Sequence, residues 1–136
     1  MAEQKTVVVT GGTRGIGKGL ARELLKRGHN TVICGRTQEA VNAAISDISG
    51  DAIDGARAAG IACDVTNHDQ VQALWGFSKQ EFRDVDIWIN NAGMSNTRFP
   101  IGHLTQDDVE AIPAVNLVGS MNGSQVALQG MNAQRH

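Results

Sequence analysis

Short runs of consecutive apolar residues alternate along the chain with longer segments in which apolar residues recur every three or four positions. The first pattern is typical of strands buried on both faces of a parallel sheet, and the second of amphipathic helices. Together the two patterns predict strands over residues 5–10, 31–35, 61–65 and 86–90, a loop over 50–60, and helices over 15–27, 37–49, 66–82 and 105–131. Because strands alternate with helices, we expect an α/β fold, a Rossmann-type doubly wound parallel sheet truncated after four of its usual about six strands.

Local signals mark the helix ends. Gly28 follows the first helix as a C-cap, and Thr66 with Asp69 and Thr105 with Asp108 have the spacing of capping boxes at the third and fourth helices. Helical spacing places Ile16, Leu20, Leu24 and Leu25 on one face of the first helix. The last helix runs through Val109, Ile112, Val115 and Leu117.

Composition narrows the class of protein. A chain of 136 residues without repeats or linkers is expected to form one domain, residues 1–136. Its net charge of −2 argues against nucleic-acid binding, and no apolar run reaches the about 18 residues of a membrane span. Since no signal peptide precedes the first strand, we expect a cytoplasmic protein whose Cys34 and Cys63 are reduced and buried. No residue pattern predicts a metal site.

A glycine-rich segment, TGGTRGIG at residues 10–17, joins the first strand to the first helix. Glycine permits a tight turn there, and the N–H groups at the start of the following helix can bind a phosphate. A turn without a ligand is one alternative. A P-loop starting at Gly12 is another, but Gly19 stands where a P-loop needs Ser or Thr. The spacing therefore favours a dinucleotide site.

Three further motifs follow in order: CDV at 63–65, NNAG at 90–93 and VNLVG at 115–119. Together with the glycine-rich segment they resemble the short-chain dehydrogenase/reductase family, from residue 7 to about 131. The resemblance implies an oxidoreductase that uses a nicotinamide dinucleotide and acts on a small carbonyl or alcohol substrate. It also implies that Asp64 binds the adenine amino group and that Val65 packs on the adenine ring. The expected cofactor-binding residues are Thr10, Gly11, Thr13, Arg14, Gly15, Ile16, Gly17, Arg36, Asp64, Val65, Asn91, Ala92 and Gly93.

The end of the second strand bears on which dinucleotide is bound. Selectivity for NAD generally needs an acidic residue there to bind the ribose 2′-hydroxyl, but this strand ends in Arg36. Arg14 projects from the glycine-rich segment toward the same corner. Either arginine alone could be a solvated surface residue. Two guanidinium groups without a carboxylate suit a 2′-phosphate, so the sequence predicts NADP(H).

Catalysis in the family depends on a Ser-Tyr-Lys-Asn set, in which the tyrosine transfers the proton. By resemblance, Asn116 is the asparagine, which keeps a helix kink and a water relay in place; Pro113 departs from the family pattern. The chain contains no tyrosine, so we expect it to bind cofactor without catalysing hydride transfer.

Three hypotheses follow. In the first, the chain is the cofactor half of an NADPH-dependent carbonyl reductase. In the second, it is an inactive NADP(H)-binding module that either senses nucleotide or pairs with a full-length relative. In the third, it is a fragment that folds poorly. Family members commonly dimerise through the helices after the fourth and fifth strands, so a homo-oligomer would use residues 105–131. The segments IACDV at 61–65 and DIWINNAG at 86–93 resemble the chlorophyll b reductase branch, which implies reduction of a chlorophyll formyl group and a chloroplast location as the alternative.

Overall fold

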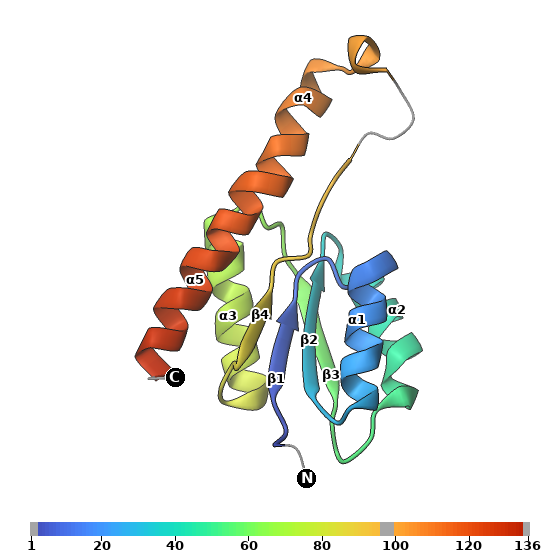
Figure 1. Cartoon of the computed structure of the whole chain (residues 1–136), viewed down its shortest axis with the longest axis vertical. Coiled ribbons are helices and arrows are strands. Elements are labelled where there is room, and N and C mark those ends of the chain that lie inside the picture. The colour runs from blue at the N-terminus through green and yellow to red at the C-terminus, as the bar shows by residue number, and fades with distance from the viewer. Residues whose placement is uncertain (1–2, 96–99, 135–136) are drawn as a thin grey trace.

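The fold is a four-stranded parallel sheet with helices on both faces, in the strand order β3-β2-β1-β4 (Figure 1). This computed structural model describes residues 3–95 and 100–134. The strands are β1 (Thr6–Val9), β2 (Asn30–Gly35), β3 (Ala58–Ala62) and β4 (Ile87–Ile89). The helices are α1 (Gly15–Lys26), α2 (Gln38–Ile48), α3 (His68–Phe82), α4 (Gln106–Pro113) and α5 (Gly119–Gln134), with short turns of 3₁₀-helix at Ser49–Asp51 and Ile101–His103. The predicted α/β, doubly wound architecture is confirmed.

Strand β1 is fully buried because both faces of the sheet are covered. Val7 and Val9 pack into one core with residues of α1 and α2, and Val8 packs into a second core with residues of α3 and α5. All three valines have no exposed surface, as the unbroken apolar run predicts. Figure 1 shows the same arrangement, with α1 and α2 on one side of the sheet and α3 and α5 on the other.

Helix α1 has a different buried face from the one that its apolar residues predict. Ile16 is 78% exposed and Leu20 is 37% exposed, whereas Gly17, Ala21 and Leu25 are buried. These three residues are spaced by four positions and therefore share one face of the helix. Two of them are small, which lets the start of α1 lie close to the sheet. The prediction for Ile16 and Leu20 was wrong because it counted apolar residues and ignored the small ones.

Strand β3 begins three residues earlier than predicted, at Ala58 instead of Ile61. Its register against β2 pairs Ile33 with Gly60, and a Cβ at Gly60 would lie 2.8 Å from a methyl group of Val41 in α2. Close packing by α2 therefore selects small residues in this strand, and small residues gave no apolar run to recognise. The predicted loop over 50–60 was correspondingly too long.

The N-terminus of α3 is capped by Asn67, whose side chain accepts a hydrogen bond from the backbone N–H of Gln70 at 3.1 Å. The predicted capping box of Thr66 and Asp69 is therefore wrong. The Thr66 hydroxyl instead donates to Asp64 Oδ1 at 2.7 Å. Competing cap residues in adjacent positions cannot be separated from spacing alone.

The C-terminal helical segment is divided in three. The predicted capping box of Thr105 and Asp108 is present at the start of α4, but a π-helical stretch over Ala114–Val118 separates α4 from α5. It directly follows Pro113, which cannot donate a backbone hydrogen bond. Helix α4 extends beyond the sheet (Figure 1), and its Val109 is 48% exposed. Leu117 in the π-helical stretch is 60% exposed. Among the residues that the structure describes, no helix is long and apolar enough to cross a membrane.

Candidate functional site

A large cleft, about 930 Å³ in volume, opens over the carboxyl ends of the strands. In open parallel sheets this edge is where ligands bind, beside the point at which the strand order reverses. Here that point lies between β1 and β4. The cleft is lined by twelve of the thirteen residues expected to bind cofactor: Gly11, Thr13, Arg14, Gly15, Ile16, Gly17, Arg36, Asp64, Val65, Asn91, Ala92 and Gly93.

The glycine-rich turn packs too closely against its neighbours for side chains. Gly11 has a positive φ of 66°, and a Cβ there would lie 2.8 Å from the Ala92 Cα. At Gly17 a Cβ would overlap the carbonyl oxygen of Gly11 and the Nδ2 atom of Asn91. The chain therefore needs glycine at both positions to place the first turn of α1 at the floor of the cleft.

The start of α1 leaves its first N–H groups available. Arg14 occupies the N-cap position in an extended conformation, but its side chain makes no capping hydrogen bond, and the first turn contains no acidic residue. A helix N-terminus in this state attracts an anion, because its N–H groups and the helix dipole both favour negative charge. The N-terminal turn of α1 thus fits a phosphate group.

Thr10 lies beneath the cleft and does not line it. Its side chain is buried, and its hydroxyl oxygen accepts hydrogen bonds from the backbone N–H groups of Asn91 and Ala92, both at 3.0 Å. Asn91 Nδ2 in turn donates to the carbonyl oxygens of Thr10 and Gly11, both at 3.1 Å. These bonds join the ends of β1 and β4. Asn90 instead donates to the hydroxyl of Ser124.

We predict that Thr10→Val destabilises the protein by about 2–4 kcal/mol, because two buried N–H groups would lose their acceptor at about 1–3 kcal/mol each. Thr10→Ser keeps the hydroxyl and is the matched control, with most of the stability retained. Urea unfolding followed by tryptophan fluorescence measures both variants. Equal midpoints for the valine and serine variants would contradict the role of these hydrogen bonds.

The corner of the cleft beyond β2 is basic. Arg14, Lys18 and Arg36 line it, while Asp64 is the one carboxylate among the described residues of the lining. Lys18 forms an ion pair with Asp47 on α2, whereas the ion pairs of the described residues include neither Arg14 nor Arg36.

Asp64 follows β3 and has local partners. Its Oδ1 atom accepts from the backbone N–H of Thr66 at 3.0 Å as well as from the Thr66 hydroxyl. Its own backbone N–H donates to Gln70 Oε1 at 2.8 Å. The second carboxylate oxygen has no hydrogen bond among these, so the structural role at the start of α3 leaves room for a ligand contact.

Asn116 lies in the π-helical stretch and anchors the segment after β4. Its Oδ1 accepts from the backbone N–H of Met94 at 2.8 Å, and its Nδ2 donates to the Met94 carbonyl at 2.6 Å. A Cβ on Gly93 would lie 3.3 Å from that same Oδ1. Asn116 itself does not line the cleft, whereas its neighbour Val115 does. Its position at a helix irregularity is as expected, with Pro113 just before it.

Sequence reasoning missed Cys34 and Cys63 as residues of the cleft. Both line it, on adjacent strand ends, and both are almost fully buried. The positions of the two cysteines in the predicted strands could have indicated this, because residues at the carboxyl ends of neighbouring parallel strands lie at the same edge of the sheet. Among the described residues, no group of three or more potential metal ligands comes together.

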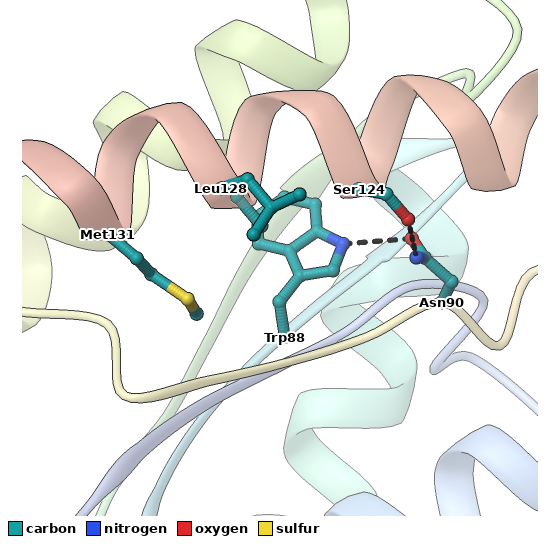
Figure 2. Close-up of a pocket in the computed structure, with 6 residues that line it drawn as sticks. Trp88, Asn90, Ser124, Leu128 and Met131 are labelled. Atoms are coloured by element: carbon teal, nitrogen blue, oxygen red, sulfur yellow. Dashed lines mark hydrogen bonds between the residues drawn. The ribbon is translucent and has the colours of Figure 1, made fainter. Parts of the chain in front are cut away.

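A smaller hollow, about 290 Å³, lies at the outer edge of the sheet between β4 and α5. Figure 2 shows Trp88 beneath Leu128, with its indole nitrogen donating to Asn90 Oδ1 at 2.9 Å. The Trp88 ring also lies 6.2 Å from that of Trp75, between ring centres. Trp88 therefore packs at the outer edge of the sheet and does not line the cleft.

The sequence profile of the short chain dehydrogenase family matches residues 5–136. The chain belongs to this family. It is 35% identical to the probable chlorophyll(ide) b reductase NYC1 of Oryza sativa, over 98% of this chain and 29% of the relative. It is 36% identical to chlorophyll(ide) b reductase NOL of Arabidopsis thaliana, over 98% of this chain and 38% of the relative. The chain therefore spans well under half the length of these family members.

Solved structures of the family share the fold. A short-chain dehydrogenase/reductase from Mycobacterium marinum superposes with a TM-score of 0.85 at 28% identity, over 96% of this chain and 50% of that one. An alcohol dehydrogenase from Thermococcus sibiricus, solved with 5-hydroxy-NADP, gives a TM-score of 0.84 at 24% identity, over 96% of this chain and 55% of that one. The short chain dehydrogenase family is thus established by the sequence profile, and the solved structures share its fold.

Proposed function

We propose that the chain is the NADP(H)-binding part of a reductase that transfers hydride from NADPH to a carbonyl group. The observation that supports NADP(H) over NAD(H) is the basic corner of the cleft, where Arg14 and Arg36 stand and β2 ends without a carboxylate. A ribose 2′-phosphate carries negative charge and several acceptor oxygens, which paired guanidinium groups bind well.

The rest of the cleft fits the remaining parts of the dinucleotide. The uncapped N–H groups at the start of α1 would hold the pyrophosphate, above the turn that Gly11 and Gly17 keep free of side chains. Asp64 would accept from the adenine amino group, and Val65 would pack against the ring. Asn91, Ala92 and Gly93 would lie along the cofactor at the end of β4. When bound, NADPH supplies the hydride for reduction of a carbonyl carbon.

We propose that this chain by itself does not complete the reaction. Carbonyl reduction needs a proton donor at the substrate oxygen, and the sequence holds no tyrosine. Asn116 is engaged by both its amide atoms with the Met94 backbone, so it acts as a positioning residue for the segment after β4. The proton-transferring group would have to come from outside these 136 residues.

A formyl group on a chlorophyll ring is the substrate that we propose for the full-length reductase. This rests on the similarity to proteins named as chlorophyll(ide) b reductases and on the segments at 61–65 and 86–93. We propose the cytoplasm as its compartment. The chloroplast is the alternative, because those relatives are named as chloroplastic. A fluorescent fusion to the full-length protein distinguishes the two compartments.

Calorimetric titration of the folded chain with NADPH and with NADH tests the cofactor assignment. We expect NADPH to bind at least about tenfold more tightly, which corresponds to about 1.4 kcal/mol from the 2′-phosphate contacts. Equal affinities would contradict the assignment of the basic corner. An absence of binding by folded protein would contradict the cofactor site as a whole.

The inactive-module hypothesis is favoured by the same lack of tyrosine and predicts identical binding. An assay with a range of aldehydes and ketones separates it from the reductase hypothesis, provided that the full-length protein is measured beside the 136-residue chain. Turnover by the full-length protein alone supports the reductase. Turnover by the short chain would contradict our account of its missing proton donor.

Sedimentation of the full-length protein tests the expected homo-oligomer, with residues 105–131 as its interface.

A further inference from the structure

The two cysteines of the chain meet at the floor of the cleft. Cys34 is near the end of β2, and Cys63 directly follows β3. The register of the two strands pairs Cys34 with Ile61, so Cys63 lies two residues further along on the same face of the sheet. Both residues line the cleft. They belong to one buried cluster and are 1% and 3% exposed.

Both cysteines are tied to the elements that shape the cleft. The backbone N–H of Gly12 donates to the Cys34 carbonyl at 3.0 Å. The backbone N–H of Cys63 donates to the carbonyl of Gly35 at 2.8 Å. A change in the distance between the two sulfur atoms would therefore shift the backbone of the glycine-rich turn and of the end of β2.

The pair is electrostatically unequal. The hydrogen bond from Cys63, and then that from the Gly11 N–H, lower the pKa of the Cys34 thiol against the opposing effect of burial. The pKa of the Cys63 thiol is raised by its hydrogen bond to Cys34, by burial, and by the charges of Cys34 and Asp64. Cys34 is therefore the thiol of the pair that ionises more readily. A thiolate beside a second thiol is the arrangement in which an oxidised cysteine is resolved as a disulfide.

We propose that Cys34 and Cys63 are a thiol-oxidation site, in which a small hydroperoxide entering the empty cleft converts the pair to a disulfide that weakens nucleotide binding. The Cys34 thiolate attacks the terminal hydroxyl oxygen of the hydroperoxide, so that a sulfur–oxygen bond forms and the oxygen–oxygen bond breaks. The leaving alkoxide, or hydroxide in the case of hydrogen peroxide, takes up the proton that Cys34 released. Cys63 sulfur then attacks Cys34 sulfur, and the hydroxyl group leaves as water with the proton of the Cys63 thiol. With hydrogen peroxide the sum is two thiols and one peroxide giving one disulfide and two waters.

The effect on binding follows from the geometry and rests on the proposed nucleotide site. A disulfide holds its two sulfur atoms about 2.05 Å apart. The end of β2 and the residue after β3 must then approach, beneath the positions of Arg36 and Asp64. Conversely, a nucleotide that fills the cleft covers the path to the sulfurs, so bound nucleotide is expected to protect them.

The experiment treats the folded chain with hydrogen peroxide and maps disulfides by peptide mass spectrometry, without nucleotide and then with saturating NADPH. We expect a cross-linked peptide joining Cys34 and Cys63, its loss in Cys34→Ala and in Cys63→Ala, and slower formation in the presence of NADPH. Non-reducing electrophoresis separates it from a disulfide between molecules. Intact thiols, or oxidation of Cys34 that stops at a sulfinic acid, would overturn the proposal.

Titration of the oxidised protein with NADPH tests whether the disulfide weakens nucleotide binding. We expect the affinity to fall at least about tenfold, to return after reduction with dithiothreitol, and to be insensitive to peroxide in the Cys63→Ala variant. A disulfide with unchanged affinity would overturn the coupling to the cleft. If the reduced protein fails to bind NADPH, the proposed function fails, whereas disulfide mapping without nucleotide still decides whether the oxidation site exists.

Discussion

Arg36→Asp is expected to weaken NADPH binding by about 100-fold, or about 2.7 kcal/mol, and to leave NADH binding within a few-fold of the unchanged protein. The substitution removes a charge-assisted contact, which contributes about 1.5–3 kcal/mol, and adds repulsion of the 2′-phosphate. A new carboxylate at the end of β2 can also accept a hydrogen bond from the ribose 2′-hydroxyl of NADH. Calorimetric titration with both nucleotides measures the change as a ratio of dissociation constants.

Arg27→Asp is the matched control, because it makes the same change in charge at the C-terminal end of α1. Arg27 forms an exposed ion pair with Glu23 and lies outside the cleft. We expect its NADPH affinity to change less than about threefold, since exposed ion pairs contribute about 0–1 kcal/mol. Equal losses in the two variants would mean that net charge, and not the basic corner, governs binding. An unchanged NADPH affinity in Arg36→Asp would assign the 2′-phosphate to another part of the cleft.

Gly17→Ala is expected to destabilise the protein by about 3 kcal/mol, the upper range for an overpacked site. The added methyl group would overlap the carbonyl oxygen of Gly11 and the Nδ2 atom of Asn91, so α1 must move away from the turn. Because α1 would then no longer present its first N–H groups at the floor of the cleft, NADPH affinity should fall as well. Urea unfolding and calorimetric titration measure the two effects.

Gly19→Ala provides the comparison within the same helix. Gly19 is exposed, and a Cβ there would meet no atom within 4 Å. Replacing glycine by alanine inside a helix stabilises it by about 1 kcal/mol, so this variant should unfold at higher urea concentration than the unchanged protein. A loss of stability in Gly19→Ala similar to that in Gly17→Ala would contradict the packing argument and indicate a general intolerance of α1 to substitution.

The hydrophobic pattern of the sequence predicts most of the fold because it reports local burial. The run of valines in β1 identifies a strand covered on both faces, and the cap at Thr105 identifies the start of α4. It fails at β3, where small residues are selected by the neighbouring helix α2 and leave no apolar run. Ile16 was misplaced for a related reason, since close packing of α1 depends on Gly17 and Ala21.

The candidate site divides in the same way. The sequence alone determined that a glycine-rich turn precedes a helix, that Arg36 and not an acidic residue follows the second strand, and that no tyrosine is present. Each of these depends on neighbouring residues or on composition. Only the tertiary structure decided that Thr10 lies beneath the cleft, that Asn116 anchors Met94, and that Cys34 meets Cys63. Those contacts join residues about 20 to 80 positions apart, and the order and register of the strands, which bring such residues together, are set by the packing of the whole sheet.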